Sequence, residues 1–184
     1  IATKYHEEFV NSFNKMDFSV LLSNSDFDDN KLHLLETLTD IVYKTSNSND
    51  RAFANQLLGD FKLLENSWQF CDKILMKSNN MYSKFFAVSI LEDLVNTKFN
   101  LLANDQKEVI RNFIIDILIK TVNSNTGGND QLTALVNKLN IVVVAIAKSE
   151  WATTWKTFIA EICSAGKSTQ ELCENNVKIL LMLT

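Results

Sequence analysis

Few side chains in this sequence have the type and spacing that catalysis or metal binding requires. The histidines, His6 and His33, stand alone, and no cysteine has metal-ligand spacing with a histidine or with another cysteine. The cysteines, Cys71, Cys163 and Cys173, are odd in number in a chain of 184 residues, which indicates free thiols in a reducing compartment. We therefore expect neither a metal site nor a thiol nucleophile.

The carboxylates and glycines offer equally little chemistry. Asp28 and Asp29 lie in polar sequence, where solvation denies them the burial that general acid–base work needs. Gly127 and Gly128 fall in the one clear loop, residues 123–130, and no strand precedes them as a phosphate-binding loop requires. The sequence predicts no catalytic residue and no cofactor, so an enzyme is not expected.

The composition limits the classes of partner. A hydrophobic content of 46% suffices for a continuous core, and a formal net charge of −4 argues against direct binding of nucleic acid. The longest apolar run, Ile141 to Ala147, is too short to cross a bilayer, so no membrane partner is expected. The chain starts at Ile1 and stops within an apolar stretch, which suggests a piece of a longer protein.

The elements that would position any functional side chain are helices. The sequence has no proline and only four glycines, and apolar residues recur every three or four positions. This pattern predicts a weak helix over 5–22 and further helices over 30–45, 50–64, 67–77, 80–99, 105–123, 130–148, 150–165 and 168–183. Candidate N-caps are Ser67, Asn80, Asn104, Asn129, Ser149 and Ser168.

These helices pair naturally into hairpins of roughly forty residues, over 30–64, 67–99, 105–148 and 150–183. That period is typical of α-solenoids built from HEAT or armadillo repeats. The hairpins share little sequence, and a compact helical bundle would satisfy the same pattern. The fold class is all-α in either case.

Polar side chains form a strip along the second helix of each of the first three hairpins. Residues placed 100° apart on 80–100 leave a narrow polar arc on an otherwise apolar helix. In a solenoid, equivalent helices lie side by side, so such strips would merge into one extended binding surface. The candidate residues, hereafter the polar strip, are Ser89, Asp93, Asn96 and Asn100, then Thr133, Asn137 and Asn140, then Arg51 and Asn55. The tryptophans, Trp68, Trp151 and Trp155, are expected in the core.

Several segments together carry a resemblance to a known family. They are Leu34-Leu35, Tyr43, Arg51, Trp68, Ile74-Leu75, Met81, Lys84-Phe85-Phe86, Ile90-Leu91-Glu92, Thr97-Lys98-Phe99, Ile119-Lys120-Thr121, Lys138-Leu139-Asn140, Glu150-Trp151, Trp155, Thr157-Phe158-Ile159 and Leu172-Cys173-Glu174-Asn175-Asn176. From about Asn30 onward the chain resembles the N-terminal region of nuclear transport receptors of the importin-β superfamily, its exportins in particular. Ala152 and Lys156 stand where that family usually has proline.

The resemblance implies a right-handed superhelix of HEAT repeats. Residues 26–184 would form an N-terminal domain of the importin-β type, preceded by a helix or extension over 1–25. Its inner helices would bind the small GTPase Ran in the GTP state, so that Ran and not this chain carries the nucleotide. Cargo with leucine-rich export signals would bind later repeats, and nucleoporins would be further partners. Such a receptor would shuttle between nucleus and cytoplasm through pores of the nuclear envelope. The alternatives are an importin of the same superfamily and a HEAT scaffold outside transport.

Overall fold

The computed structural model describes residues 16–23, 25–125 and 127–184. The weak helix expected over 5–22 therefore falls mostly outside the described residues, and only its end is seen, as the short 3-10 helix η1 (Phe18–Leu22). The α-helices are α2 (Asp29–Lys44), α3 (Ser48–Leu63), α4 (Cys71–Lys77), α5 (Met81–Thr97), α6 (Asn104–Ser124), α7 (Asp130–Glu150), α8 (Phe158–Ala165) and α9 (Gln170–Met182). Two further 3-10 helices, η2 (Ser67–Phe70) and η3 (Phe99–Leu101), precede α4 and follow α5.

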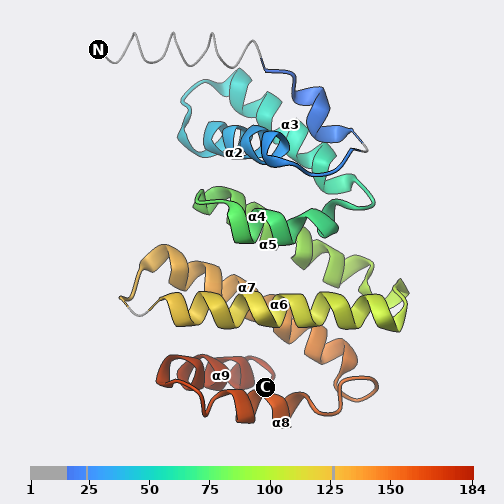
Figure 1. The fold of residues 1–184 in the computed structure, drawn as a ribbon, viewed down its shortest axis with the longest axis vertical. Coiled ribbons are helices and arrows are strands. Elements are labelled where there is room, and N and C mark those ends of the chain that lie inside the picture. The colour runs from blue at the N-terminus through green and yellow to red at the C-terminus, as the bar shows by residue number, and fades with distance from the viewer. Residues whose placement is uncertain (1–15, 24, 126) are drawn as a thin grey trace.

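The helices form antiparallel pairs that stack along one axis (Figure 1). Each helix packs on its partner in the pairs α2–α3, α4–α5, α6–α7 and α8–α9, and the pairs meet through α2–α5, α5–α7 and α7–α9. Each pair thus contacts its neighbours along the stack, as in a solenoid, and not all the others, as in a bundle. The predicted α-solenoid is confirmed.

Side-chain caps start most of the longer helices. The side chains of Asn47, Asn80 and Asn129 accept hydrogen bonds from backbone N–H groups in the first turns of α3, α5 and α7, and those of Asp28 and Thr169 do so for α2 and α9. The predicted caps Asn80 and Asn129 are confirmed. The others were wrong by a residue or more: Ser67 and Asn104 are first residues of η2 and α6, Ser149 lies inside α7, and Ser168 precedes the true cap of α9.

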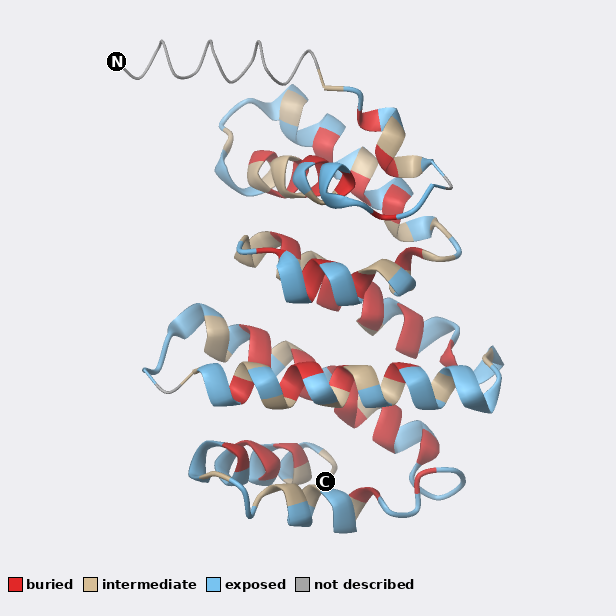
Figure 2. Cartoon of the chain, viewed as in Figure 1, coloured by how far each residue is buried: buried red, intermediate tan, exposed pale blue. Residues whose placement is uncertain are grey.

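The core follows the sides of the helices that face one another (Figure 2). Helices α5 and α7 each supply more of it than any other helix, because neighbours pack on several sides of each; Leu91 and Leu139 are fully buried. Full burial of one such side chain contributes roughly 1.5–3 kcal/mol. Helix α7 is long and apolar enough to span a membrane by length and composition alone, but half of that window is buried within the protein, as in a core helix of a solenoid.

One predicted helix is shorter than expected. Helix α7 continues to Glu150, a turn region follows, and α8 starts only at Phe158, so the helix predicted over 150–165 was wrong in its first half. The carbonyl of Glu150 accepts the N–H groups of Thr153, Thr154 and Trp155, which reverses the chain there. Trp155 then turns into the core, whereas Trp151 remains 43% exposed, contrary to the prediction.

Candidate functional site

The second helices of successive pairs form a row, α3, α5, α7 and α9. Helices α5, α7 and α9 pack side by side. The ammonium of Lys138 on α7 lies 3.7 Å from the carboxylate of Glu92 on α5, and the hydroxyl of Ser149 near the end of α7 donates to Asn100 just beyond α5. Because later residues of one helix meet later residues of the other, α5 and α7 run in the same direction.

This register places Asp93 and Asn137 on one side of the row. Glu92 faces α7 and Lys138 faces α5. Asp93 follows Glu92 on α5, and Asn137 precedes Lys138 on α7. Each step of one residue turns the side-chain direction by about 100° around the helix axis. Because the two helices are parallel and the steps are opposite, both side chains turn to the same side of the row. Both side chains are exposed there, as is that of Asn96 on α5. The structure thus brings strip residues of two helices onto one surface.

Helix α3 joins this surface through an ion pair. The ammonium of Lys62 lies 2.7 Å from a carboxylate oxygen of Asp93 and donates a 3.3 Å hydrogen bond to the hydroxyl of Ser89. Asn55 is exposed on α3, two turns before Lys62. An ion pair at such an exposed position contributes at most about 1 kcal/mol to stability, so it can open at little cost when a partner binds.

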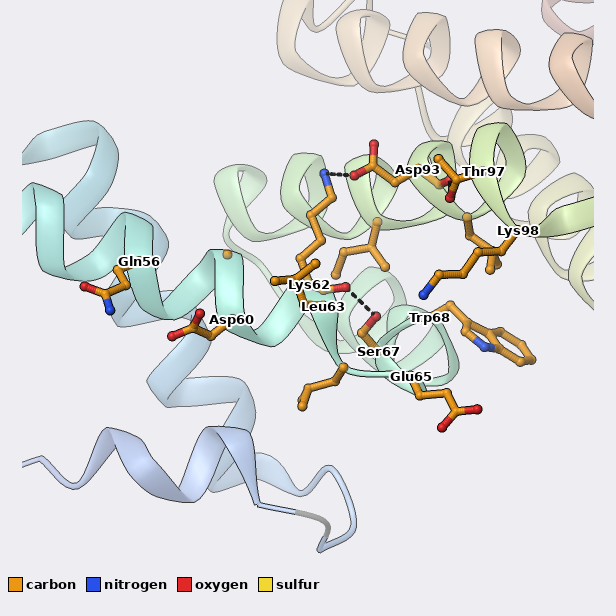
Figure 3. Close-up of a pocket in the computed structure, with 14 residues that line it drawn as sticks. Gln56, Asp60, Lys62, Leu63, Glu65, Ser67, Trp68, Asp93, Thr97 and Lys98 are labelled. Carbon is orange, nitrogen blue, oxygen red and sulfur yellow. Dashed lines mark hydrogen bonds and ion pairs between the residues drawn. The ribbon is translucent and has the colours of Figure 1, made fainter.

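A groove of about 590 Å³ separates α3 from α5 beside this ion pair (Figure 3). Polar side chains line its rim and apolar ones its base, where Trp68 is half-buried and Leu94 is buried. Leu63 lies at the edge and is 80% exposed. A second groove of about 750 Å³ shares Trp68 and Leu94 and extends to Leu101, which is 85% exposed. Sequence reasoning missed these grooves, because each apolar residue in isolation fits a helix interior.

The other strip residues act partly within the fold. Thr133 accepts a hydrogen bond of 2.8 Å from the amide of Asn125 and stabilises the loop before α7. Arg51 donates from its guanidinium to the carbonyl of Thr45 at the end of α2. Asn100 lies in η3 and accepts from Ser149. Arg51 and Asn100 remain exposed, and Thr133 lines a polar cleft of about 150 Å³ together with Asn137.

The inclusion of Asn140 in the polar strip was wrong. Its side chain is only 1% exposed and exchanges hydrogen bonds of 2.8 and 3.0 Å with the amide of Asn175 on α9. Asn140 lies at the edge of the strip that faces the next pair, so α9 covers it. It is a contact between repeats and is not available to a partner.

The surface carries no group arranged for covalent chemistry. Among the described residues no His, Cys, Asp and Glu side chains cluster as metal ligands. Burial raises the pKa of the Cys71 thiol far above its ordinary value, which keeps it protonated and unreactive. Asp28 caps α2 and Asp29 pairs with Lys77 at an exposed position. Exposed amides, a loose ion pair and an apolar groove are suited to reversible recognition of another protein.

Comparisons with known proteins agree with this kind of site. The chain matches the family described as Importin-beta N-terminal domain over residues 54–120 and the family described as Exportin 1-like protein over residues 132–184. It is 38% identical to Exportin-1 of Dictyostelium discoideum over 154 residues and 35% identical to Exportin-1 of Drosophila melanogaster over 153 residues. Each alignment covers 83% of this chain and 14% of the relative. Exportin-1 of Schizosaccharomyces pombe is 37% identical over 131 residues, 71% of this chain and 12% of the relative.

The expected resemblance is thereby confirmed, over most of the stacked pairs and on both sides of the loop before α7. The chain spans about one seventh of the length of the curated relatives that it matches. With its HEAT-like solenoid and these matches, the chain belongs to the importin-β superfamily, in the exportin-1-like branch.

Proposed function

We propose that this chain is the N-terminal part of a nuclear export receptor and that its row of second helices binds Ran in the GTP state. The observation that carries the proposal is the shared surface of α3, α5 and α7, where Asn55, Asp93 and Asn137 are exposed on successive helices of an exportin-1-like chain. Arg51, Ser89, Asn96, Asn100 and Thr133 would contribute at its margins.

Recognition of this kind needs no chemistry from the receptor. Hydrolysis of GTP releases the switch segments of a small GTPase from their ordered conformation, so a surface that fits the ordered form loses its partner on hydrolysis. The Lys62–Asp93 pair suits this role because the Asp93 carboxylate is exposed and can leave Lys62 to contact a group of the partner. The nucleotide belongs to Ran, and the chain itself needs no cofactor.

The remaining partners follow from the role of an exportin. Cargo with leucine-rich export signals would bind to parts of the protein beyond these residues, cooperatively with Ran, because both favour one curvature of the solenoid. Contacts with nucleoporins and shuttling between nucleus and cytoplasm would accompany this role. The match to the Exportin 1-like family over residues 132–184 favours an exportin over an importin or an unrelated scaffold.

The test is a binding measurement with Ran loaded either with a non-hydrolysable GTP analogue or with GDP. We expect binding of the GTP form to exceed binding of the GDP form by at least about tenfold, or 1.4 kcal/mol. Equal affinity for both forms would contradict the proposal.

Variants of this chain locate the surface. Joint replacement of Asn55, Asp93 and Asn137 by Ala should weaken binding of the GTP form at least about tenfold, because alanine substitutions in an interface centre remove its few energetic contacts. The matched control replaces Glu108 and Asn112 by Ala. Both are exposed on α6, the first helix of its pair and so not part of the row of second helices, and the change should leave affinity for Ran unchanged. If the control pair weakened binding of the GTP form more than the triple variant, the Ran-binding surface would lie on the first helices of the pairs.

A further inference from the structure

A small crevice lies between the second and third helix pairs, apart from the polar strip. Its volume is about 190 Å³, and its walls come from α4, α5, α6 and α7, which lie next to one another in the stack (Figure 1). Its lining shares no residue with the polar strip. The lining residues are Leu75, Met76, Lys84, Ile117, Lys120, Thr121, Ser124, Leu132 and Leu135.

The charged groups in this crevice are all cationic. Lys84 projects from α5 and Lys120 from α6, and no carboxylate belongs to the lining. Lys120 is paired with Asp116 of its own helix at 2.5 Å. The hydroxyls of Thr121 and Ser124 already donate to the backbone carbonyls of Ile117 and Lys120. The ammonium of Lys84 is therefore the donor that remains wholly for a ligand, and that of Lys120 can share its protons between Asp116 and a ligand.

Lys84 differs from the other partly buried lysines of the described residues. The ammonium of Lys31 donates to two carbonyls, and those of Lys62, Lys107 and Lys138 each pair with a carboxylate. Within the described part of the chain the ammonium of Lys84 has neither kind of partner, and burial alone lowers its pKa, without a nearby carboxylate to offset the effect. Partial burial of a cation without a counter-charge costs free energy of desolvation. An anion that binds beside the cation would offset that cost.

The rest of the lining indicates what carries the anion. Leu75, Ile117 and Leu135 are buried at the base, and Met76 is 56% exposed at the mouth. A free phosphate or carboxylate ion would leave these apolar walls uncovered, since the crevice has several times the volume of one water, about 30 Å³. A charged group on an apolar stem, next to another apolar side chain, fills the space better.

We propose that this crevice, the Lys84 crevice, binds the carboxylate of an acidic side chain that a partner protein presents beside a large apolar residue. The carboxylate pairs with the ammonium groups of Lys84 and Lys120, and the apolar residue covers Met76 and Leu132. The chain as a whole has a formal charge of −4, so this local excess of positive charge distinguishes the crevice from the surrounding surface. The site is independent of Ran binding.

The probe is a short capped peptide, acetyl-Gly-Leu-Glu-Leu-Gly-amide, and its counterpart with Gln in place of Glu. Titration of the methyl-labelled chain by NMR should shift signals of Met76, Leu132 and Leu135 with the Glu peptide. We expect the Gln peptide to bind at least about tenfold more weakly. Equal binding of the two peptides, or no shifts at these methyl groups, would overturn the proposal, as would sodium acetate binding as tightly as the Glu peptide.

Variants assign the effect to Lys84. Lys84→Met keeps the length of the side chain and removes its charge. It should weaken binding of the Glu peptide at least about tenfold. It should also raise the thermal midpoint of the chain, because an unpaired, partly buried charge is removed. Lys84→Gln is the second variant should the first not fold. The matched control is Lys148→Met, at an exposed lysine of α7, which should leave peptide affinity unchanged. Unchanged affinity in both Lys84 variants, or a control that weakens binding as much, would contradict the assignment.

Discussion

Asn137 and Asn140 show how the same side chain acquires opposite roles on one helix. Both lie on α7, and three residues of an α-helix rotate by about 300°, which turns Asn140 from the exposed side toward α9. Asn137 is exposed, whereas Asn140 and Asn175 are buried and satisfy each other's amides. A reciprocal pair of this kind fixes the register between neighbouring helix pairs, because any shift leaves two buried amides unpaired.

Asn140→Ala and Asn175→Ala are therefore expected to destabilise the chain by about 1–3 kcal/mol each, since each leaves the partner's buried amide unsatisfied. The double variant should cost less than the two single changes together, because it removes both amides. Urea unfolding of the four proteins measures these free energies. Asn137→Ala is the control on the same helix and should change stability by less than about 0.5 kcal/mol. Additive losses would refute the coupling.

Glu161 gives a pH-dependent contribution at the start of α8. Hydrogen bonds from the side chains of Thr157 and Trp155, followed by the charge of Arg111, lower the pKa of its carboxyl below the ordinary 4.5. A carboxylate whose folded pKa is lowered stabilises the fold above its unfolded pKa, and this contribution is lost as the pH falls through the folded pKa.

Replacement by Gln tests this sign. Glu161→Gln should lower the thermal midpoint at pH 6, and the difference from the unchanged chain should shrink as the pH falls below 4.5. The loss should stay below about 1 kcal/mol, because the carboxyl is exposed and screened. Glu108→Gln, at an exposed position of α6, is the control for the loss of one surface carboxylate. A difference that grows toward low pH would reverse the expected sign.

At the scale of the elements, the turn region between α7 and α8 replaces half of a predicted helix. Side chains hold it in place: Trp155 packs edge-to-face against Phe158 with ring centroids 4.5 Å apart, Arg111 lies over the Trp155 ring, and Lys107 pairs with the buried Glu150. Local sequence favours a helix here, but burial of Trp155 and compensation of the Glu150 charge outweigh that preference. Tertiary contacts thus set the end of α7 and the start of α8.

Lys156 is the position in this segment that should accept proline. Its N–H donates to no backbone carbonyl within the described chain, so Lys156→Pro removes no hydrogen bond and restricts the unfolded state, and we expect stability to hold or to rise by about 0.4–1 kcal/mol. Thr154→Pro is the contrasting variant: its N–H donates to Glu150, so it should be destabilising. Differential scanning calorimetry compares them. A large loss in Lys156→Pro would show that the turn needs another backbone conformation.

At the scale of the whole molecule, helix α9 of the last described pair exposes an apolar side. Leu172 and Ile179 pack inward, while Val177 is 50% exposed and Leu181, one turn later on the same side, is 66% exposed. In a solenoid each pair covers the apolar side of the one before it, so such a face favours contact with another helix.

The chain of 184 residues should therefore self-associate as its concentration rises. The double variant Val177→Lys with Leu181→Lys should remain monomeric in sedimentation velocity, because charges on this face oppose its burial. The control, Val109→Lys on α6, alters another exposed apolar position, 61% exposed, and should associate like the unchanged chain. Association that persists in the double variant would place the contact elsewhere.

The fold was largely predictable, because apolar spacing gives the angular position of each side chain about its own helix, and that is a local property. The candidate surface was predictable in part. Asp93 and Asn137 lie on one surface as inferred, but the groove with Leu63 and Trp68 gave no signal, because exposed apolar residues beside a groove have the same spacing as core residues. The unpaired state of Lys84 was equally hidden, since it depends on which groups α4, α6 and α7 bring near it.

Apolar and polar spacing in the sequence was enough to predict the helices, their pairing into hairpins and the polar residues along the second helix of a pair. Which polar edge meets the next pair and which meets solvent depends on how the pairs pack, so that Asn140 is buried and Asn137 is exposed. The physical reason is that helix periodicity depends on neighbours along the chain, whereas burial, counter-charge and groove shape depend on residues brought together from distant parts of it.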